Sequence, residues 1–301
     1  MTAAAPIERT LRIGTRESRL AMAQAAIAAD VLAPVAGSGQ LVPISTSGDA
    51  ISARHPTARW VETDGQFTRE LERALLDERV DLVVHSFKDL PTAPVEGLVI
   101  SAVLERADAR DCLVTADGTG LEELPFGARI GTSSPRRAAQ LAAVRADLIA
   151  LPIRGNVETR LRRLEAGEYD AVILAAAGLD RLGISVPDGS RLPFDVMLPA
   201  PAQGALALQV RSADTGLRAA LARIDHRPTR VAVDAERSLL RRIGGGCLAP
   251  LGALGEVEGE CLRLRAAHEL AGGGFARAEA VGPADDPEGV VAAVADRILE
   301  S

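Results

Sequence analysis

The sequence predicts an α/β protein with two lobes, a cleft between them and a small third domain of mixed α/β type. The first observation is an internal repeat: Leu-Arg-Ile-Gly-Thr at residues 11–15 recurs as Ala-Arg-Ile-Gly-Thr at residues 128–132, each copy leading from a strand into a helix start. The second is that the apolar runs 81–86 and 170–175 each follow an amphipathic helical pattern and end in a polar or glycine-rich loop. Strands that alternate with helices form parallel sheets, and the duplicated order predicts two lobes.

The pattern changes after Val210. A helix is predicted over 228–243, because proline suits its first turn, apolar residues recur at helical spacing and Gly244 can cap its end. Strand-like pieces follow around 251–253 and 262–266, and the last helix is predicted over 287–299, where one apolar stripe recurs. These elements predict the third domain. The expected boundaries are residues 1–104 with 204–222 for lobe 1, 105–203 for lobe 2 and 223–301 for the third domain.

Composition excludes several classes of protein. The 301 residues carry 34 basic and 41 acidic side chains, for a net charge of -7 and a pI near 5.3, whereas a general nucleic-acid binder needs a broad cationic surface. Aromatic residues make up 2%, which leaves no stacking platform for bases. Residues 1–10 hold no signal peptide, and the uncharged stretch 196–210 is too short to span a bilayer, so we expect a cytoplasmic protein without membrane or nucleic-acid partners.

Two arginines stand at a predicted helix start in the segment 132–137, Thr-Ser-Ser-Pro-Arg-Arg. The serines and Pro135 are typical of a helix N-terminus, where the helix dipole already disfavours cations. A bound anion removes that penalty, so the segment with Arg136 and Arg137 is predicted to form an anion site. The alternative is that both arginines turn to solvent or to a neighbouring carboxylate.

Two further predicted helix starts carry arginines. Arg154 and Arg160 flank Asn156, a predicted N-cap, and Arg16 lies in the segment 14–18 of the other lobe, which repeats the arrangement. Arg162 and Arg163 continue the run and suit a solvated helix face. Three arginine-bearing helix starts predict a cleft that holds several carboxylates or phosphates by paired hydrogen bonds.

The chain has one lysine, Lys88, and it lies beside Asp89 in the segment 85–91, His-Ser-Phe-Lys-Asp-Leu-Pro. This segment follows the predicted strand 82–84, at the end where ligands bind in open α/β sheets. The pair offers a cation for an anionic substrate and a carboxylate for proton transfer or cation stabilisation. The alternative is an ordinary turn with a local salt bridge, ended by Pro91.

Cys247 follows three glycines, which leave a thiol accessible as a candidate nucleophile or attachment point. The alternative is an incidental loop cysteine. Cys112 and Cys261 are predicted to be buried strand cysteines, and three cysteines without CxxC spacing indicate free thiols in a reducing compartment. The four histidines are too scattered to predict a metal site.

The order and spacing of these motifs over nearly the whole chain resemble the porphobilinogen deaminase family, also called the hydroxymethylbilane synthases. The motifs that carry the resemblance are Ile13-Gly14-Thr15-Arg16, the segment 85–91, Arg110-Asp111, Gly131-Thr132-Ser133-Ser134, Arg136-Arg137, Arg154-Gly155-Asn156-Val157, Ala177-Gly178-Leu179, Ala202-Gln203-Gly204 and Gly245-Gly246-Cys247.

The resemblance implies two lobes similar to those of periplasmic binding proteins and a third domain that carries the cofactor cysteine. It implies that Cys247 forms a thioether to a dipyrromethane cofactor, to which four porphobilinogen units are added with loss of ammonia before hydroxymethylbilane is released by hydrolysis. It also implies a transferase that is a monomer. Asp89 corresponds to the catalytic carboxylate. The residues implied to bind the cofactor and substrate carboxylates are Arg16, Arg136, Arg137, Arg154, Arg160 and Arg181, with Ser18, Ser86, Lys88, Thr132, Ser133, Ser134 and Gln203.

Two departures from the family pattern stand out. The family often has Lys-Gly-Leu-Phe where this chain has Asp64-Gly65-Gln66-Phe67. The lysine expected to contact an anion is therefore absent, and Arg59 and Arg69 are the candidate substitutes. Pro135 replaces a common leucine, a change that a first helical turn tolerates. A non-catalytic anion-binding protein on the same scaffold is the competing hypothesis; it needs neither Cys247 nor Asp89.

Overall fold

The computed structural model describes residues 9–48, 67–187, 189–244, 249–270 and 274–301. Its strands are β1 (Leu11–Arg16), β2 (Gly39–Ile44), β3 (Leu82–Ser86), β4 (Leu98–Val103), β5 (Asp111–Val114), β6 (Arg129–Gly131), β7 (Ile149–Leu151), β8 (Ala171–Ala175), β9 (Leu206–Arg211), β10 (Leu251–Glu258), β11 (Cys261–Glu269) and β12 (Phe275–Pro283). Its helices are α1 (Arg19–Ala36), α3 (Arg69–Leu76), α4 (Pro135–Val144), α5 (Val157–Glu165), α6 (Ala176–Arg181), α7 (Thr215–Leu221), α8 (Arg227–Ile243) and α9 (Pro287–Leu299), with the 3-10 turns η1 (Phe87–Asp89) and η2 (Leu121–Glu123).

Two of the three sheets share one strand order. The first runs β2-β1-β3-β9-β4 and the second β7-β6-β8-β5. In the first sheet β1 pairs in parallel with β2 and β3, and β9 runs antiparallel to β3. In the second, β6 pairs in parallel with β7 and β8, and β5 runs antiparallel to β8. The sequence repeat therefore occupies equivalent strands, β1 and β6, and the predicted two-lobed α/β fold is confirmed.

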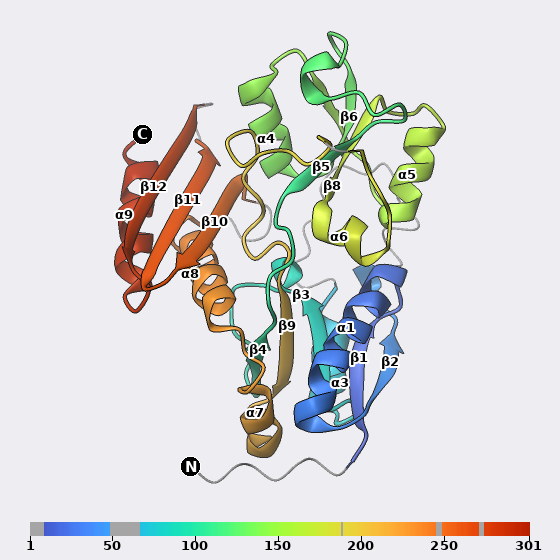
Figure 1. The fold of residues 1–301 in the computed structure, drawn as a ribbon, viewed down its shortest axis with the longest axis vertical. Coiled ribbons are helices and arrows are strands. Elements are labelled where there is room, and N and C mark those ends of the chain that lie inside the picture. The colour runs from blue at the N-terminus through green and yellow to red at the C-terminus, as the bar shows by residue number, and fades with distance from the viewer. Residues whose placement is uncertain (1–8, 49–66, 188, 245–248, 271–273) are drawn as a thin grey trace.

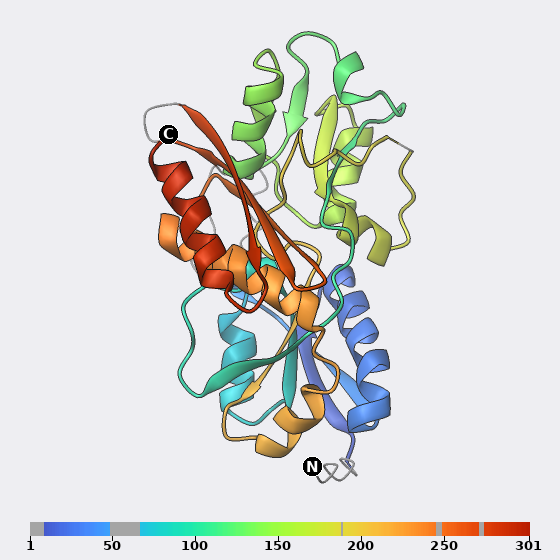
Figure 2. The same cartoon turned by 60° about the vertical axis from the view of Figure 1, so that its left-hand side comes forward.

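The lobes lie end to end along the long axis, and the third sheet with α8 and α9 lies beside both (Figures 1 and 2). This sheet is antiparallel, β10-β11-β12, and α9 packs on it as its apolar stripe predicts. The third domain also contacts both lobes: its helix α8 lies against β4 of lobe 1, and its strand β11 lies against α4 of lobe 2. The predicted helices 228–243 and 287–299 are confirmed, and the two predicted strand pieces are parts of longer strands.

Glu236 of α8 joins the third domain to both segments that cross between the lobes. Its carboxylate is fully buried and accepts from Arg106 Nη1 at 2.6 Å, from the Ala202 backbone N–H at 2.6 Å and from the Gly255 backbone N–H at 2.7 Å. Arg106 follows β4 and Ala202 precedes β9, so the two crossings and the third sheet meet at one side chain.

Helix α1 is, within the described ranges, the one helix that by length and composition could span a membrane. Its N-cap is Ser18, whose side chain accepts from the Ala21 N–H at 3.3 Å. Its small residues Ala25 and Ala28 and its Leu32 are buried in the core of the first sheet. The apolar composition of α1 is explained by this packing against β1, β2 and β3.

The prediction for Cys261 is wrong. It lies in strand β11 as expected, but its side chain is exposed, whereas Cys112 is buried. Cys261 is the first residue of β11, directly after the turn at Gly259, and burial alternates along the strand so that Leu262 and Leu264 face the core. Successive side chains of a strand point to opposite faces, which places Cys261 outside.

Candidate active site

A cavity of about 750 Å³ lies between the two lobes. Lobe 1 contributes strand ends and the start of α1, and lobe 2 contributes the starts of α4, α5 and α6. Among the residues that the structure describes, the charged ones that line it are Arg16, Lys88, Arg137, Arg154, Arg160 and Arg181, with the carboxylates Glu17 and Asp89. Ser18 and Ser86 line it as well. Nine of the predicted site residues therefore surround one space, and among its described lining residues cations outnumber carboxylates.

The lobe 1 side of the cavity is built at the carboxyl ends of β1 and β3. Strand β3 ends at Ser86, whose hydroxyl exchanges hydrogen bonds with the Gln24 side chain at 2.9 and 3.0 Å. The turn η1 then presents Lys88 and Asp89. The guanidinium of Arg16 lies 4.1 Å from the centre of the Phe67 ring, which also lines the cavity.

The lobe 2 side is built around two helix starts. Asn156 caps α5 by accepting from the Thr159 N–H at 2.8 Å, which confirms the predicted N-cap. Arg160 Nε donates to the Gly155 carbonyl at 3.0 Å, and Arg181 Nη2 donates to the Gly204 carbonyl at 2.6 Å. Burial lowers the pKa of Arg160 and of Arg181 to about 10 in each case, so both remain cations at neutral pH.

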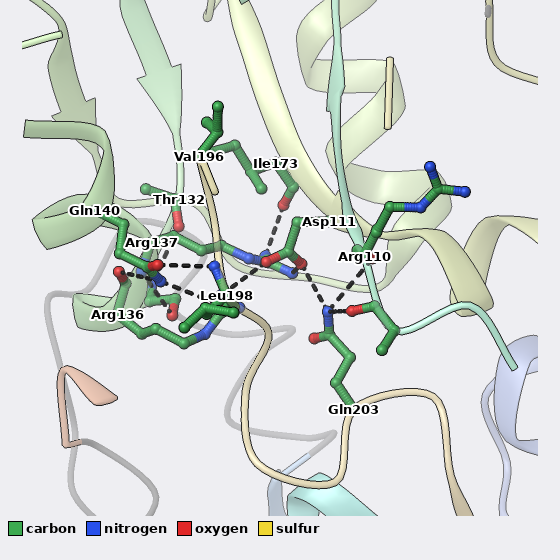
Figure 3. Close-up of polar contacts among 12 residues, drawn as sticks. Arg110, Asp111, Thr132, Arg136, Arg137, Gln140, Ile173, Val196, Leu198 and Gln203 are labelled. Carbon is green, nitrogen blue, oxygen red and sulfur yellow. Dashed lines mark hydrogen bonds and ion pairs between the residues drawn. The ribbon is translucent and has the colours of Figure 1, made fainter. Parts of the chain in front are cut away.

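At the start of α4, the structure shows an internal partner for both arginines of the predicted anion site. Arg136 Nη1 and Arg137 Nη2 each lie 2.7 Å from a different oxygen of Asp111, so an internal carboxylate pairs with both cations (Figure 3). All three side chains are buried, and the two arginines hold the pKa of Asp111 well below its usual range against the opposing effect of burial. The neighbouring carboxylate, the alternative at this position, is the observed partner; Arg137 still lines the cavity between the lobes, and Arg136 does not.

The hydroxyl groups of Thr132, Ser133 and Ser134 in the same segment form hydrogen bonds with nearby backbone groups. Ser134 caps α4 by accepting from the Arg137 N–H, as predicted, and Thr132 Oγ1 accepts from the Ser134 N–H at 3.1 Å. The Ser133 hydroxyl donates to the Ile153 carbonyl at 2.8 Å and accepts from its N–H at 2.9 Å. Thr132, Ser133 and Ser134 do not line the cavity between the lobes.

Lys88 lies among charges of both signs. Burial lowers the pKa of Lys88 to about 8, Asp89 and Asp111 oppose that shift, and Arg136 and Arg137 add to it. Its Nζ donates to Gln203 Oε1 at 3.1 Å, and Gln203 Nε2 in turn donates to Asp111 Oδ1 at 2.9 Å. Gln203 is fully buried and is not part of the cavity lining.

Two predicted features lie outside the described residues. Cys247 is in the segment 245–248, and Arg59 and Gln66 are in the segment 49–66. Ala249, the first described residue after 245–248, lines a small cavity of about 50 Å³ together with Lys88, Ser134 and Arg136. Residues of the third domain and residues around Lys88 therefore line the same small cavity.

Sequence reasoning missed Asp111, Gln24 and Phe67 as members of the site. Asp111 was visible in the Arg110-Asp111 motif, but its partners lie 25 and 26 residues further along the chain. Gln24 lies in the alanine-rich helix α1 and gave no signal. Among the described residues, no group of histidine, cysteine, aspartate and glutamate is placed to hold a metal ion.

Comparison with known proteins assigns the chain to a family. A family model described as "Porphobilinogen deaminase, dipyromethane cofactor binding domain" matches residues 11–219, and one described as "Porphobilinogen deaminase, C-terminal domain" matches residues 231–300. The porphobilinogen deaminase of Desulforudis audaxviator is 48% identical over 98% of this chain and 96% of its own. That of Roseiflexus sp. is 44% identical over 98% of this chain and 97% of its own.

Similarity to solved structures is weaker. The periplasmic VFT2 domain of BvgS from Bordetella pertussis is 12% identical and covers 71% of this chain and 86% of that chain, with a TM-score of 0.41. The family models and the relatives together span both lobes and the third domain. The chain therefore belongs to the porphobilinogen deaminase family and contains that family's dipyrromethane cofactor-binding domain.

Proposed function

We propose that this chain is a transferase that joins four porphobilinogen units head to tail on a cysteine-bound dipyrromethane primer and releases hydroxymethylbilane by hydrolysis. The observation that carries the proposal is that Asp89 lines one cavity together with the cations Arg16, Arg137, Arg154, Arg160, Arg181 and Lys88. Each porphobilinogen carries an acetate and a propionate, so a growing chain of rings is a growing row of anions. Cations contributed by both lobes match that row.

Asp89 is the proposed catalytic carboxylate. In each condensation the C–N bond of the aminomethyl group breaks, ammonia leaves, and the resulting cationic methylene carbon bonds to a pyrrole carbon that then loses its proton. Asp89 lies close enough to Lys88 and Arg160 for its negative charge to raise the pKa of both and so favour their charged forms. A carboxylate in this position stabilises the positive pyrrole and holds the departing proton, while the surrounding guanidinium groups bind the ring carboxylates.

The residues present fit the dipyrromethane group. Arg137 and Arg154 provide guanidinium donors for its carboxylates, and Ala249, two residues beyond Cys247, lines the small cavity that Lys88 also lines. We propose Cys247 as the attachment point. When bound, the group supplies the free pyrrole position to which the first substrate unit is joined. We further propose a monomer in the cytoplasm, with porphobilinogen as its small-molecule partner.

The intact mass of the purified protein tests this proposal. We expect the chain mass plus one dipyrromethane adduct, and we expect Cys247→Ala to lack the adduct while Cys112→Ala and Cys261→Ala retain it. Incubation of adduct-free protein with porphobilinogen is the control for isolation of the apo form. A chain that acquires no adduct under that incubation would favour the anion-binding protein instead.

A further inference from the structure

We infer that Gln203 is a positioning residue: it fixes the ammonium of Lys88 in lobe 1 to the Asp111 carboxylate in lobe 2 and so couples the cations of the two lobes. The inference deepens the proposed function, because it concerns the cations of the same cavity. The family resemblance implied a ligand contact for Gln203. The contacts of its side chain indicate a different role.

The amide of Gln203 is committed to protein partners. Its Oε1 accepts from Lys88 Nζ at 3.1 Å, and its Nε2 donates to the Ala109 carbonyl at 2.8 Å. The same Nε2 donates to Asp111 Oδ1 at 2.9 Å (Figure 3). An ammonium only donates and a carboxylate only accepts, so these two neighbours fix which end of the amide faces each of them. The fully buried side chain therefore has a single orientation.

The backbone that carries Gln203 is held just as firmly. Arg106 Nε donates to the Gln203 carbonyl at 2.7 Å, and Arg181 Nη2 donates to the Gly204 carbonyl. Gly204 has a φ of +89°, and a Cβ there would lie 2.5 Å from the Ala107 carbonyl oxygen. This crossing segment therefore packs tightly against the other crossing, near Ala107, and the amide is aimed from a fixed support.

Gln203 lies between the ammonium of Lys88 and the carboxylate of Asp111, within a cluster of charges of both signs. The charged groups around Lys88 are Asp89 on η1, Asp111 on β5, Arg136 and Arg137 on α4, and Arg237, which lines the same small cavity. Asp111 is already paired with both α4 arginines. The amide dipole presents its oxygen to Lys88 and its N–H to Asp111, which lets the lone lysine approach this cluster while it keeps its charge.

The single lysine of the chain makes the test direct. Protein grown with lysine labelled by carbon-13 at Cε gives one signal, and its shift against pH reports the midpoint of Lys88 ionisation. Gln203→Met keeps the size of the side chain and removes the acceptor for Lys88. We expect the midpoint to fall by about one unit, the effect of one hydrogen bond to a charged group.

Gln203→Glu is the opposite variant. It places a carboxylate beside Lys88, so we expect the midpoint to rise by about one unit or more. Gln209→Met is the matched control, because Gln209 is also a buried glutamine but its side chain bonds to His85. We expect that variant to leave the Lys88 midpoint unchanged. A midpoint that stays at the wild-type value in both Gln203 variants overturns the inference, and if Gln203→Met does not fold, Gln203→Glu alone decides.

The titration separates this inference from the proposed function, since it needs no turnover. If the protein acquires no dipyrromethane adduct but its Lys88 midpoint moves as expected, the proposed function fails and the inference about Gln203 stands. If the protein carries the adduct but the midpoint does not move in the Gln203 variants, the proposed function stands and the inference fails. In active protein we also expect Gln203→Met to raise KM at pH 7.5 more than it lowers kcat, because it alters the charge of an anion-binding lysine rather than the reacting carboxylate.

Discussion

Arg12 and Asp81 form a clamp in lobe 1 that Arg129 and Asp170 repeat in lobe 2. The backbone N–H of each arginine donates to one carboxylate oxygen at 2.7 Å, and Nη2 lies 2.9 Å from the other. Each clamp ties the start of the strand that carries the sequence repeat, β1 or β6, to the residue just before its parallel neighbour, β3 or β8. The internal repeat therefore conserves an ion pair as well as a strand order.

The two clamps differ in burial, which predicts unequal effects of removing them. Asp81 is 1% exposed and Asp170 36%. We expect Asp81→Asn to lower the free energy of unfolding by about 2 kcal/mol and Asp170→Asn by less than about 1 kcal/mol, measured by urea unfolding. Equal losses from the two variants would show that burial does not set the strength of the clamp.

The Asp81 clamp also predicts an acid dependence. Its arginine partners lower the pKa of Asp81 from 3.8 to about 2 against the opposing effect of burial. The folded state binds the proton less tightly than the unfolded state, so this contribution to stability is complete above about pH 4 and is lost as pH falls through 2. Between pH 4 and 2, Asp81→Asn should lose less stability than the wild type.

Replacement of Asp89 tests the proposed chemistry. We expect Asp89→Asn to retain the dipyrromethane adduct by mass and to lose turnover by about 10²- to 10⁴-fold, because the amide does not stabilise a positive pyrrole as a carboxylate does. Asp30→Asn, on the exposed face of α1, is the control and should keep wild-type turnover. Near-normal activity of Asp89→Asn would remove this residue from the mechanism.

Lys88 predicts an alkaline limb in the activity profile. Burial lowers its pKa from 10.5 to about 8, so the ammonium is present below pH 8 and is lost above it. We expect kcat/KM to fall above about pH 8, chiefly through KM. Lys88→Arg keeps the charge to higher pH and should abolish the limb. A limb at the same pH in an active Lys88→Arg variant would assign it to another group.

The thiols predict a pattern of alkylation. In a Cys247→Ala background only Cys112 and Cys261 remain. Cys261 is exposed, whereas burial raises the pKa of the Cys112 thiol to about 11. Iodoacetamide at pH 8 should therefore add one label rapidly, at Cys261 by peptide mapping, and a second only after denaturation. Rapid double labelling of folded protein would contradict the burial of Cys112.

Glu236 predicts a large loss of stability when its charge is removed. Glu236→Gln leaves the partly buried Arg106 without its carboxylate and weakens the bonds to Ala202 and Gly255, so we expect the free energy of unfolding to fall by about 3 kcal/mol. Glu258→Gln, an exposed glutamate on β10, should change it by less than about 0.5 kcal/mol. A small loss in Glu236→Gln would mean that the crossings are held by other contacts.

Local signals in the sequence were sufficient for the fold class and the family. The repeated strand-to-helix segments, the caps at Ser134 and Asn156 and the apolar stripes of α8 and α9 are short-range patterns that steric and hydrogen-bonding rules translate directly into elements. The order of the motifs was enough to indicate the porphobilinogen deaminase family, which the family models and the relatives show.

Partner choice and burial were decided only by the tertiary structure. The sequence placed Arg136 and Arg137 at a helix start, but the anion that binds them is Asp111, and Gln203 reaches Asp111 across 92 residues of chain. The exposure of Cys261 likewise depends on which face of β11 meets the core. A residue type determines what a side chain can bond to, whereas long-range packing brings one particular partner within bonding distance and excludes water from it.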